Sequence, residues 1–160
     1  MPGVSREWYG YPRLVLLHFA YALILVFGTV LIHAAFTAGI IVWLRSLATH
    51  HWSRRSAARR AAVLATLVFL LSFAGYLESG LWAGFYVMVD ALPTFEDAIY
   101  FSLVTFTTLG YGDITLDEKW RVLAAFEAAN GVIMFGWTTA IIVAVAQRLF
   151  FLHPGDSKPD

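Results

Sequence analysis

The strongest constraint on this chain is its long stretches without a charged residue. Residues 14–44 contain no Asp, Glu, Lys or Arg over 31 positions, and residues 61–77 and 128–147 are uncharged over 17 and 20 positions. A helix needs about 20 apolar residues to cross the hydrocarbon core of a bilayer. With 59% hydrophobic and 14% charged residues overall, the sequence therefore predicts an all-α integral membrane protein with three transmembrane helices.

The first stretch is longer than one crossing requires. At 1.5 Å per residue it reaches about 46 Å, roughly 16 Å more than the hydrocarbon core. We expect a single long tilted helix, because no proline interrupts it. The alternative is a break near residues 33–39, which would bring the N-terminus to the cytoplasmic side. His18 and His33 lie in this span, either as functional ionisable groups or as neutral imidazoles bonded to a neighbouring helix.

The charged residues are segregated along the chain. Five arginines lie between the first and second spans: Arg45, Arg54, Arg55, Arg59 and Arg60. Seven acids lie between the second and third spans before the next basic residue: Glu78, Asp90, Glu96, Asp97, Asp113, Asp117 and Glu118. The positive-inside rule then predicts a multi-pass cell-membrane protein with its N-terminus outside, its C-terminus in the cytoplasm, and a cytoplasmic arginine linker that contacts anionic lipid headgroups.

Aromatic and acidic residues suggest where the membrane boundaries lie. We expect Glu78 to meet interfacial water, with Trp82, Phe85 and Tyr86 in an aromatic belt like that of residues 1–13. Trp120 with Arg121 should mark the re-entry of the chain at the outer interface. A short helix should start after Pro93, with Thr94 as its N-cap. Glu96 and Asp97 would then occupy its first turn, where the helix dipole favours acids.

A glycine-containing motif, residues 107–113, lies between the second and third spans and reads Thr-Thr-Leu-Gly-Tyr-Gly-Asp. Gly110 and Gly112 lack a Cβ and can adopt the positive φ angles that turn successive carbonyls the same way. The Thr108 hydroxyl adds another oxygen to this row. Such a row can replace the hydration shell of a bare cation.

This motif and its flanks resemble the potassium channel family. Residues 95–106 are similar to the family's pore helix, Asp113 to the acid after the filter, and residues 131–136 to the glycine-hinged inner helix. The resemblance covers roughly residues 61–150. It is nearest to small prokaryotic pore-only channels with one extra N-terminal helix.

The resemblance implies a homotetrameric channel with K⁺ as the permeant ion, no cofactor and no nucleic-acid partner. We also expect no enzymatic activity, because the sequence shows no Ser/His/Asp, Cys/His or metal-ligand cluster near one membrane depth. K⁺ would bind at Thr108, Leu109, Gly110 and Tyr111, with Gly112 completing the filter. The implied segments are an N-terminal helix and linker (1–60), a pore domain (61–152) and a disordered tail (153–160). Within the pore domain these are an outer helix (61–87), pore helix (94–106), filter (107–113) and inner helix (119–151).

Four residues are candidates for support of the filter: Thr107, Asp113, Tyr100 and Glu127. The resemblance implies that Tyr100 hydrogen-bonds Asp113. It also places Val104 where some family members carry Glu, and Thr115 where an aromatic ring would favour external quaternary ammonium blockers.

The third span carries a stripe at helical spacing, formed by Val132, Phe135, Thr139 and Val143. Ordinary packing explains such a stripe equally well, but the resemblance places the ion cavity on this face. Gly131 is the candidate gating hinge or a packing glycine, and Gly136 a close-packing site. Glu127 lies roughly 125° from the stripe and should face the pore helix near Thr105 and Thr107; the alternative is a cavity ring of carboxylates.

Two other functions stay open from the sequence. One is a weakly selective cation pore, because small changes behind a filter alter selectivity. The other is a non-conducting membrane assembly or regulatory subunit that retains the filter as a relic.

Overall fold

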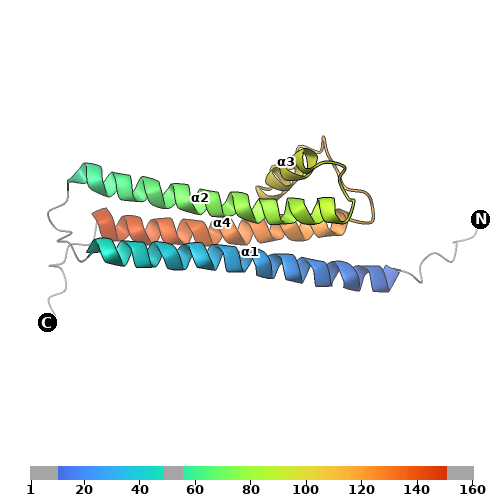
Figure 1. Ribbon diagram of the computed structural model, residues 1–160, viewed down its shortest axis with the longest axis horizontal. Helices are drawn as coiled ribbons and strands as arrows, with labels where there is room; N and C mark the ends of the chain where they lie inside the picture. The colour runs from blue at the N-terminus through green and yellow to red at the C-terminus, as the bar shows by residue number, and fades with distance from the viewer. Residues whose placement is uncertain (1–10, 49–55, 151–160) are drawn as a thin grey trace, which may run out of the picture. The chain divides into compact units, whose positions relative to one another are not determined.

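The computed structural model describes residues 11–48 and 56–150, with side chains described for 16–47 and 56–150. It contains four helices, α1 (Tyr11–Ala48), α2 (Ala57–Met88), α3 (Phe95–Phe106) and α4 (Arg121–Phe150) (Figure 1). Helices α1, α2 and α4 are long and apolar enough to span a membrane. The predicted all-α membrane fold with three spans and one short helix is confirmed. The expected aromatic belt before Tyr11, Arg54, Arg55 and the tail at 153–160 lie outside the described residues.

The first span is one uninterrupted helix of 38 residues. It continues through residues 33–39, so the alternative of a break there is wrong. No proline follows Pro12 in this segment, and Pro12 itself occupies the first turn, where its missing N–H is tolerated.

The short helix α3 begins as its sequence predicts. The Thr94 hydroxyl accepts a hydrogen bond from the Asp97 backbone N–H (3.0 Å) and donates one to Asp97 Oδ2 (2.7 Å). Glu96 and Asp97 lie in the first turn, where the helix dipole stabilises negative charge. The outer helix begins four residues earlier than expected, at Ala57, and the inner helix begins two residues later, at Arg121.

The described residues form two compact units. Unit 1 consists of residues 11–29 and Ser79–Val132, and contains α3 and the loop that follows it. Its fully buried side chains include Trp82, Tyr86, Phe106 and Leu123. Phe85 and Trp120 are also buried and pack edge to face, with ring centroids 6.1 Å apart. The predicted belt at Trp82, Phe85 and Tyr86 is therefore wrong, because these rings form the core of unit 1. Trp120 directly precedes the start of α4 at Arg121, where re-entry of the chain is expected.

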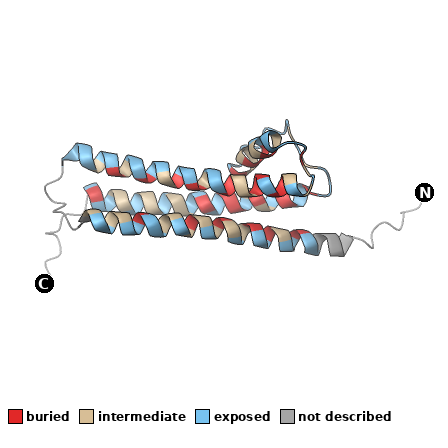
Figure 2. Cartoon of the chain, in the orientation of Figure 1, coloured by how far each residue is buried: buried red, intermediate tan, exposed pale blue. Residues whose placement is uncertain are grey.

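Unit 2 consists of Val30–Glu78 and residues 133–150. Its core cluster is Ile40, Leu67 and Leu71, and buried positions recur at intervals along the helices (Figure 2). Arg60 closes one helix end, because its Nη1 donates to the Leu149 carbonyl (3.2 Å) in the last turn of α4. Terminal carbonyls of a helix need such partners.

The expected interfacial position of Glu78 is also wrong. Helix α2 continues ten residues beyond Glu78 to Met88, and the Glu78 side chain is fully buried. Its Oε1 lies 2.8 Å from His33 Nδ1. A buried carboxylate requires a partner of this kind.

Candidate functional site

The sign of the backbone angle φ alternates along residues 108–112. Thr108, Gly110 and Gly112 have φ angles of 61°, 58° and 78°, whereas Leu109 and Tyr111 do not have positive φ. The positive φ angles at residues 110 and 112 are those that the two glycines predict.

Thr108 adopts a positive φ that the sequence did not predict. This conformation is unusual for a β-branched residue and carries about 1–3 kcal/mol of strain. Hydrogen bonds at the end of α3 hold it: the Thr108 N–H donates to the Thr105 carbonyl (2.9 Å). The neighbouring Thr107 hydroxyl donates to the Leu103 carbonyl (2.6 Å).

The first three amides of this segment donate to carbonyls of α3. The N–H groups of Leu109 and Gly110 both donate to the Val104 carbonyl, at 2.9 and 3.2 Å. Within the described part of the chain, no backbone hydrogen bond is accepted by the carbonyls of residues 108–112. Anchored amides and unbonded carbonyls leave a row of oxygens able to coordinate a cation.

The side chains of this segment are open on the single chain. Leu109 is 56% exposed and Tyr111 is 67% exposed, although both are largely apolar. Such a patch on a membrane protein requires cover from lipid or from another chain.

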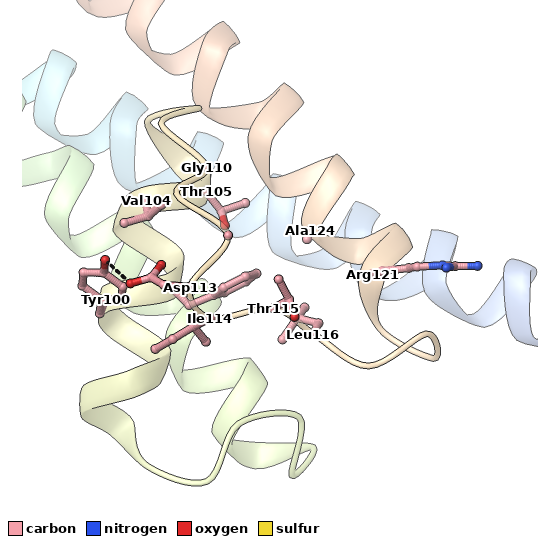
Figure 3. A pocket seen from close by; sticks show the side chains of 12 residues that line it. Tyr100, Val104, Thr105, Gly110, Asp113, Ile114, Thr115, Leu116, Arg121 and Ala124 are labelled. Atoms are coloured by element: carbon pink, nitrogen blue, oxygen red, sulfur yellow. Dashed lines mark hydrogen bonds between the residues drawn. The ribbon is translucent and has the colours of Figure 1, made fainter.

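A groove of about 240 Å³ lies between α3, the loop and the start of α4 (Figure 3). It brings together residues that the sequence analysis named separately, including Tyr100, Val104, Asp113 and Thr115. The Tyr100 hydroxyl donates to Asp113 Oδ2 at 2.7 Å, the contact that the resemblance implies. This bond, with the backbone amides of Asp113 and Ile114, lowers the pKa of the Asp113 carboxyl below its ordinary value. Asp113 is therefore an anion at neutral pH.

Glu127 of α4 is fully buried, and both of its carboxyl oxygens accept a hydrogen bond. Ser102 Oγ of α3 donates to Oε1 (2.6 Å), and the Tyr86 hydroxyl of α2 donates to Oε2 (2.7 Å). Glu127 thus faces the pore helix as its helical phase predicts. The expected contacts with Thr105 and Thr107 are wrong. The donor from α3 is Ser102, which lies about one helical turn before Thr105. No local sequence signal pointed to Tyr86, which is 41 positions away.

The two glycines of α4 differ in what surrounds them on the single chain. A Cβ on Gly131 would overlap the Phe106 carbonyl oxygen and lie 2.8 Å from its carbon. A Cβ on Gly136 would meet nothing within 4 Å on the single chain. Gly131 is therefore the close-packing site against the end of α3. Its role as a gating hinge stays a prediction.

The predicted cavity face of α4 is exposed on the single chain at all four positions, Val132, Phe135, Thr139 and Val143. The Thr139 hydroxyl donates to the Phe135 carbonyl at 2.8 Å, so it is satisfied within the helix. This exposure is compatible with a water-filled cavity, with lipid or with a second chain.

Comparison with known families identifies the domain. A family model described as "Ion channel" matches residues 62–148, which is more than half of the chain. A search of curated proteins gives no match, and a search of solved structures gives none either. The matched span includes most of α2, all of α3 with the loop described above, and most of α4, whereas α1 lies before it. The chain belongs to the ion channel family.

Proposed function

We propose that this protein is a potassium-selective channel in which four copies surround one pore and K⁺ moves passively down its electrochemical gradient. The alternating backbone of residues 108–112 carries this proposal. Carbonyls that accept no backbone hydrogen bond from the described chain can take the place of the water around a K⁺ ion once they point to the pore axis. The Thr108 hydroxyl supplies a further oxygen at one end of the row.

Assembly of several copies is expected from what one chain lacks, and the number four comes from the resemblance to potassium channels. A single strand of carbonyls covers only one side of an ion, so several copies must converge to complete its coordination shell. Closed symmetric assemblies are the usual arrangement of such copies. The exposed Leu109 and Tyr111 are compatible with cover from neighbouring copies, and the exposed predicted cavity face of α4 is compatible with a water-filled cavity that the copies enclose.

The helix dipole of α3 adds a favourable field. Helix C-termini carry partial negative charge, and the filter segment follows directly on the last turn of α3. Four such ends aimed at a central cavity would favour a cation there. Asp113, ionised because of Tyr100, would add negative charge at the outer mouth.

The charge pattern supports an orientation. Arg45, Arg59, Arg60 and Arg148 lie at helix ends in unit 2, whereas Glu96, Asp97 and Asp113 lie in unit 1. By the positive-inside rule the arginine ends face the cytoplasm, where anionic headgroups would contact them, and the N-terminus lies outside.

The test is conduction by the purified protein alone in planar bilayers, with K⁺ on one side and Na⁺, Rb⁺ or Cs⁺ on the other. We expect the reversal potential to move toward the K⁺ equilibrium potential. Gly110→Ala should abolish the K⁺ preference or the current while tetramers still assemble, because the left-handed backbone resists a side chain.

Other outcomes decide between the alternatives. Equal permeability to Na⁺ and K⁺ would indicate a weakly selective cation pore. Tetramers that pass no current under any ion gradient would indicate a non-conducting assembly or regulatory subunit. Unchanged selectivity in Gly110→Ala would contradict the assignment of residues 108–112 as the filter.

A further inference from the structure

Helix α1 lies outside the residues that match the ion channel family, yet it has a buried face with polar members. The buried positions recur at helical spacing: His18, Ala22, Leu25, Thr29, His33 and Ile40. In unit 1, the Asn130 side chain of α4 donates to the Thr29 hydroxyl at 2.8 Å. A helix that served only as a lipid-embedded anchor would have no need of buried polar contacts. Helix α1 therefore docks specifically against the pore-domain helices.

A second buried polar contact of α1 lies in unit 2, where His33 of α1 meets Glu78 of α2. His33 Nδ1 and Glu78 Oε1 are 2.8 Å apart, and the two side chains are 1% and 0% exposed. The imidazole also packs on Trp137 of α4, with ring centroids 4.9 Å apart. His33 therefore contacts both an outer-helix carboxyl and an inner-helix ring.

The pair is electrically isolated. The other titratable groups among the described residues of unit 2 are Tyr76, which is exposed, and the arginines at the helix ends: Arg45, Arg59, Arg60 and Arg148. The helix segments around the pair, residues 34–44, 61–77 and 134–147, carry no Asp, Glu, Lys or Arg. Each partner is therefore the charge or dipole that compensates the other, and removal of either one leaves a buried polar group unpaired.

The contact is also incomplete. His33 Nε2 and Glu78 Oε2 are buried and have no hydrogen-bond partner within the described residues. A polar contact that satisfies only half of its groups is less stable than a saturated network, so a competing arrangement of the helices lies closer in free energy.

We propose that the His33–Glu78 pair is a polar latch through which α1 controls the gating of the pore. Displacement of α1 moves the His33 ring, and the ring transmits this movement to Trp137. Trp137 lies between Phe135 and Thr139 in the sequence of α4, both members of the predicted cavity face. Helix α1 would then act as a built-in regulatory helix. This inference rests on the proposed conduction of ions.

The contact is tested by a double-mutant cycle on the thermal stability of the purified assembly in detergent. His33→Leu and Glu78→Leu should each lower Tm by about 10 °C, since breaking a buried pair leaves an orphaned polar group. The double variant His33→Leu/Glu78→Leu should recover most of this loss, because two apolar side chains replace a buried pair well. Additive losses in the double variant would overturn the latch. Leu31→Ala, at a position 53% exposed on the same helix, is the control and should change Tm little.

The gating role is tested by single-channel recording of the same double variant, which folds if the cycle behaves as expected. Unit conductance and ion selectivity should match the unaltered protein, because residues 108–112 are untouched. The open probability should change by at least about fivefold, the lower range of measured couplings between sites. Trp137→Phe, which retains a ring, should change open probability less than Trp137→Ala.

An unchanged open probability in the double variant would overturn the gating role and leave the pair as a packing contact. Failure of the proposed function looks different. If neither the unaltered protein nor any variant conducts, the current recordings refute both the proposed channel and its gating. The stability cycle still reports whether His33 and Glu78 are coupled.

Discussion

Two groups of oxygen atoms in unit 1 have opposite environments. Those of the predicted filter, residues 108–112, lie on exposed residues and accept no backbone hydrogen bond from the described chain. Those of the Glu127 carboxyl are fully buried, and each accepts a hydrogen bond from a different helix. The filter oxygens are available to an ion, whereas the Glu127 oxygens are already occupied by protein donors.

This difference distinguishes oxygens that can bind an ion from oxygens that hold the helices together. A polar group that stays unpaired on the folded chain must find its partner elsewhere, and for a row of carbonyls a cation is a suitable partner. A polar group with all of its partners inside the chain fixes the helices that carry those partners. Residues 108–112 and Glu127 should therefore respond differently to substitution.

A large effect on the supporting side should come from Gly131→Ala. A methyl group there would overlap the Phe106 carbonyl at the end of α3, so α4 and α3 must separate. Overpacking of this kind costs about 1–3 kcal/mol, and more where the neighbour is backbone. Thermal unfolding in detergent and the yield of assembled protein measure it. Gly136→Ala is the matched control on the same helix and should be nearly neutral; equal losses in the two variants would contradict the close-packing assignment.

Substitutions of Glu127 test directly whether its oxygens support the helices instead of binding ions. Glu127→Ala should destabilise the protein by about 2–5 kcal/mol, because it leaves a cavity and strands the Ser102 and Tyr86 hydroxyls without an acceptor. Glu127→Gln keeps one acceptor oxygen and similar volume, so it should conduct nearly normally. Thermal unfolding in detergent measures the loss of stability in Glu127→Ala, and single-channel recording with varied internal Mg²⁺ measures conduction by Glu127→Gln.

The alternative position for Glu127 gives a distinct result. If its carboxylate lined the cavity, four copies would attract Mg²⁺ from the inside. Loss of internal Mg²⁺ block in Glu127→Gln would place it there and contradict the buried geometry.

A moderate effect is expected at the outer mouth. Thr115 is exposed beside the groove and carries no ring, so external tetraethylammonium should block weakly. Thr115→Tyr should tighten block by about tenfold, since cation–π contact contributes roughly 0.5–2 kcal/mol. Dose–response curves in bilayers give the two affinities. Strong block of the unaltered protein would show that Thr115 does not hold the position that the resemblance implies.

The smallest effect concerns Tyr100→Phe and its dependence on pH. The Tyr100 hydrogen bond lowers the pKa of Asp113 from its ordinary value of 3.8. A carboxyl whose pKa is lower in the folded state stabilises the protein above its unfolded pKa, and this contribution is lost as pH falls through the folded pKa. Tyr100→Phe should therefore be less stable than the unaltered protein at pH 7, and the difference should narrow near pH 3.

Thermal unfolding at both pH values checks this prediction. Tyr76→Phe, at an exposed tyrosine of α2, is the control. A stability difference that stays the same at pH 7 and pH 3 would mean that the Tyr100 hydroxyl acts independently of Asp113 ionisation.

Much of the fold was predictable because it depends on local rules. Apolar length predicts the three spans, the absence of proline predicts the continuity of α1, and Thr94 with its following acids predicts the start of α3. The glycine spacing predicts two of the three left-handed residues in the filter segment. The third, Thr108, was not predictable, because hydrogen bonds from the end of α3 impose a conformation that its own side chain disfavours.

The long-range polar contacts were not predictable, for a different reason. Glu78 lies near the end of an uncharged stretch, as an interfacial carboxylate would, and only its contact with His33, 45 positions away, shows that it is buried. Helical phase predicted that Glu127 faces α3, but phase selects a direction and not a partner. Tyr86 has the position and type of a belt residue, yet its ring is part of a core that only folding brings together.

The most direct test of the central claim is an experimental structure of the purified protein in K⁺. We predict four copies around one axis, with K⁺ on that axis coordinated by the carbonyls of Thr108, Leu109, Gly110 and Tyr111. We also predict that the Glu127 carboxyl stays away from the axis, bonded to Ser102 and Tyr86. An assembly of another stoichiometry, or a tetramer whose residues 108–112 turn their carbonyls away from the axis and bind no K⁺, would contradict the account.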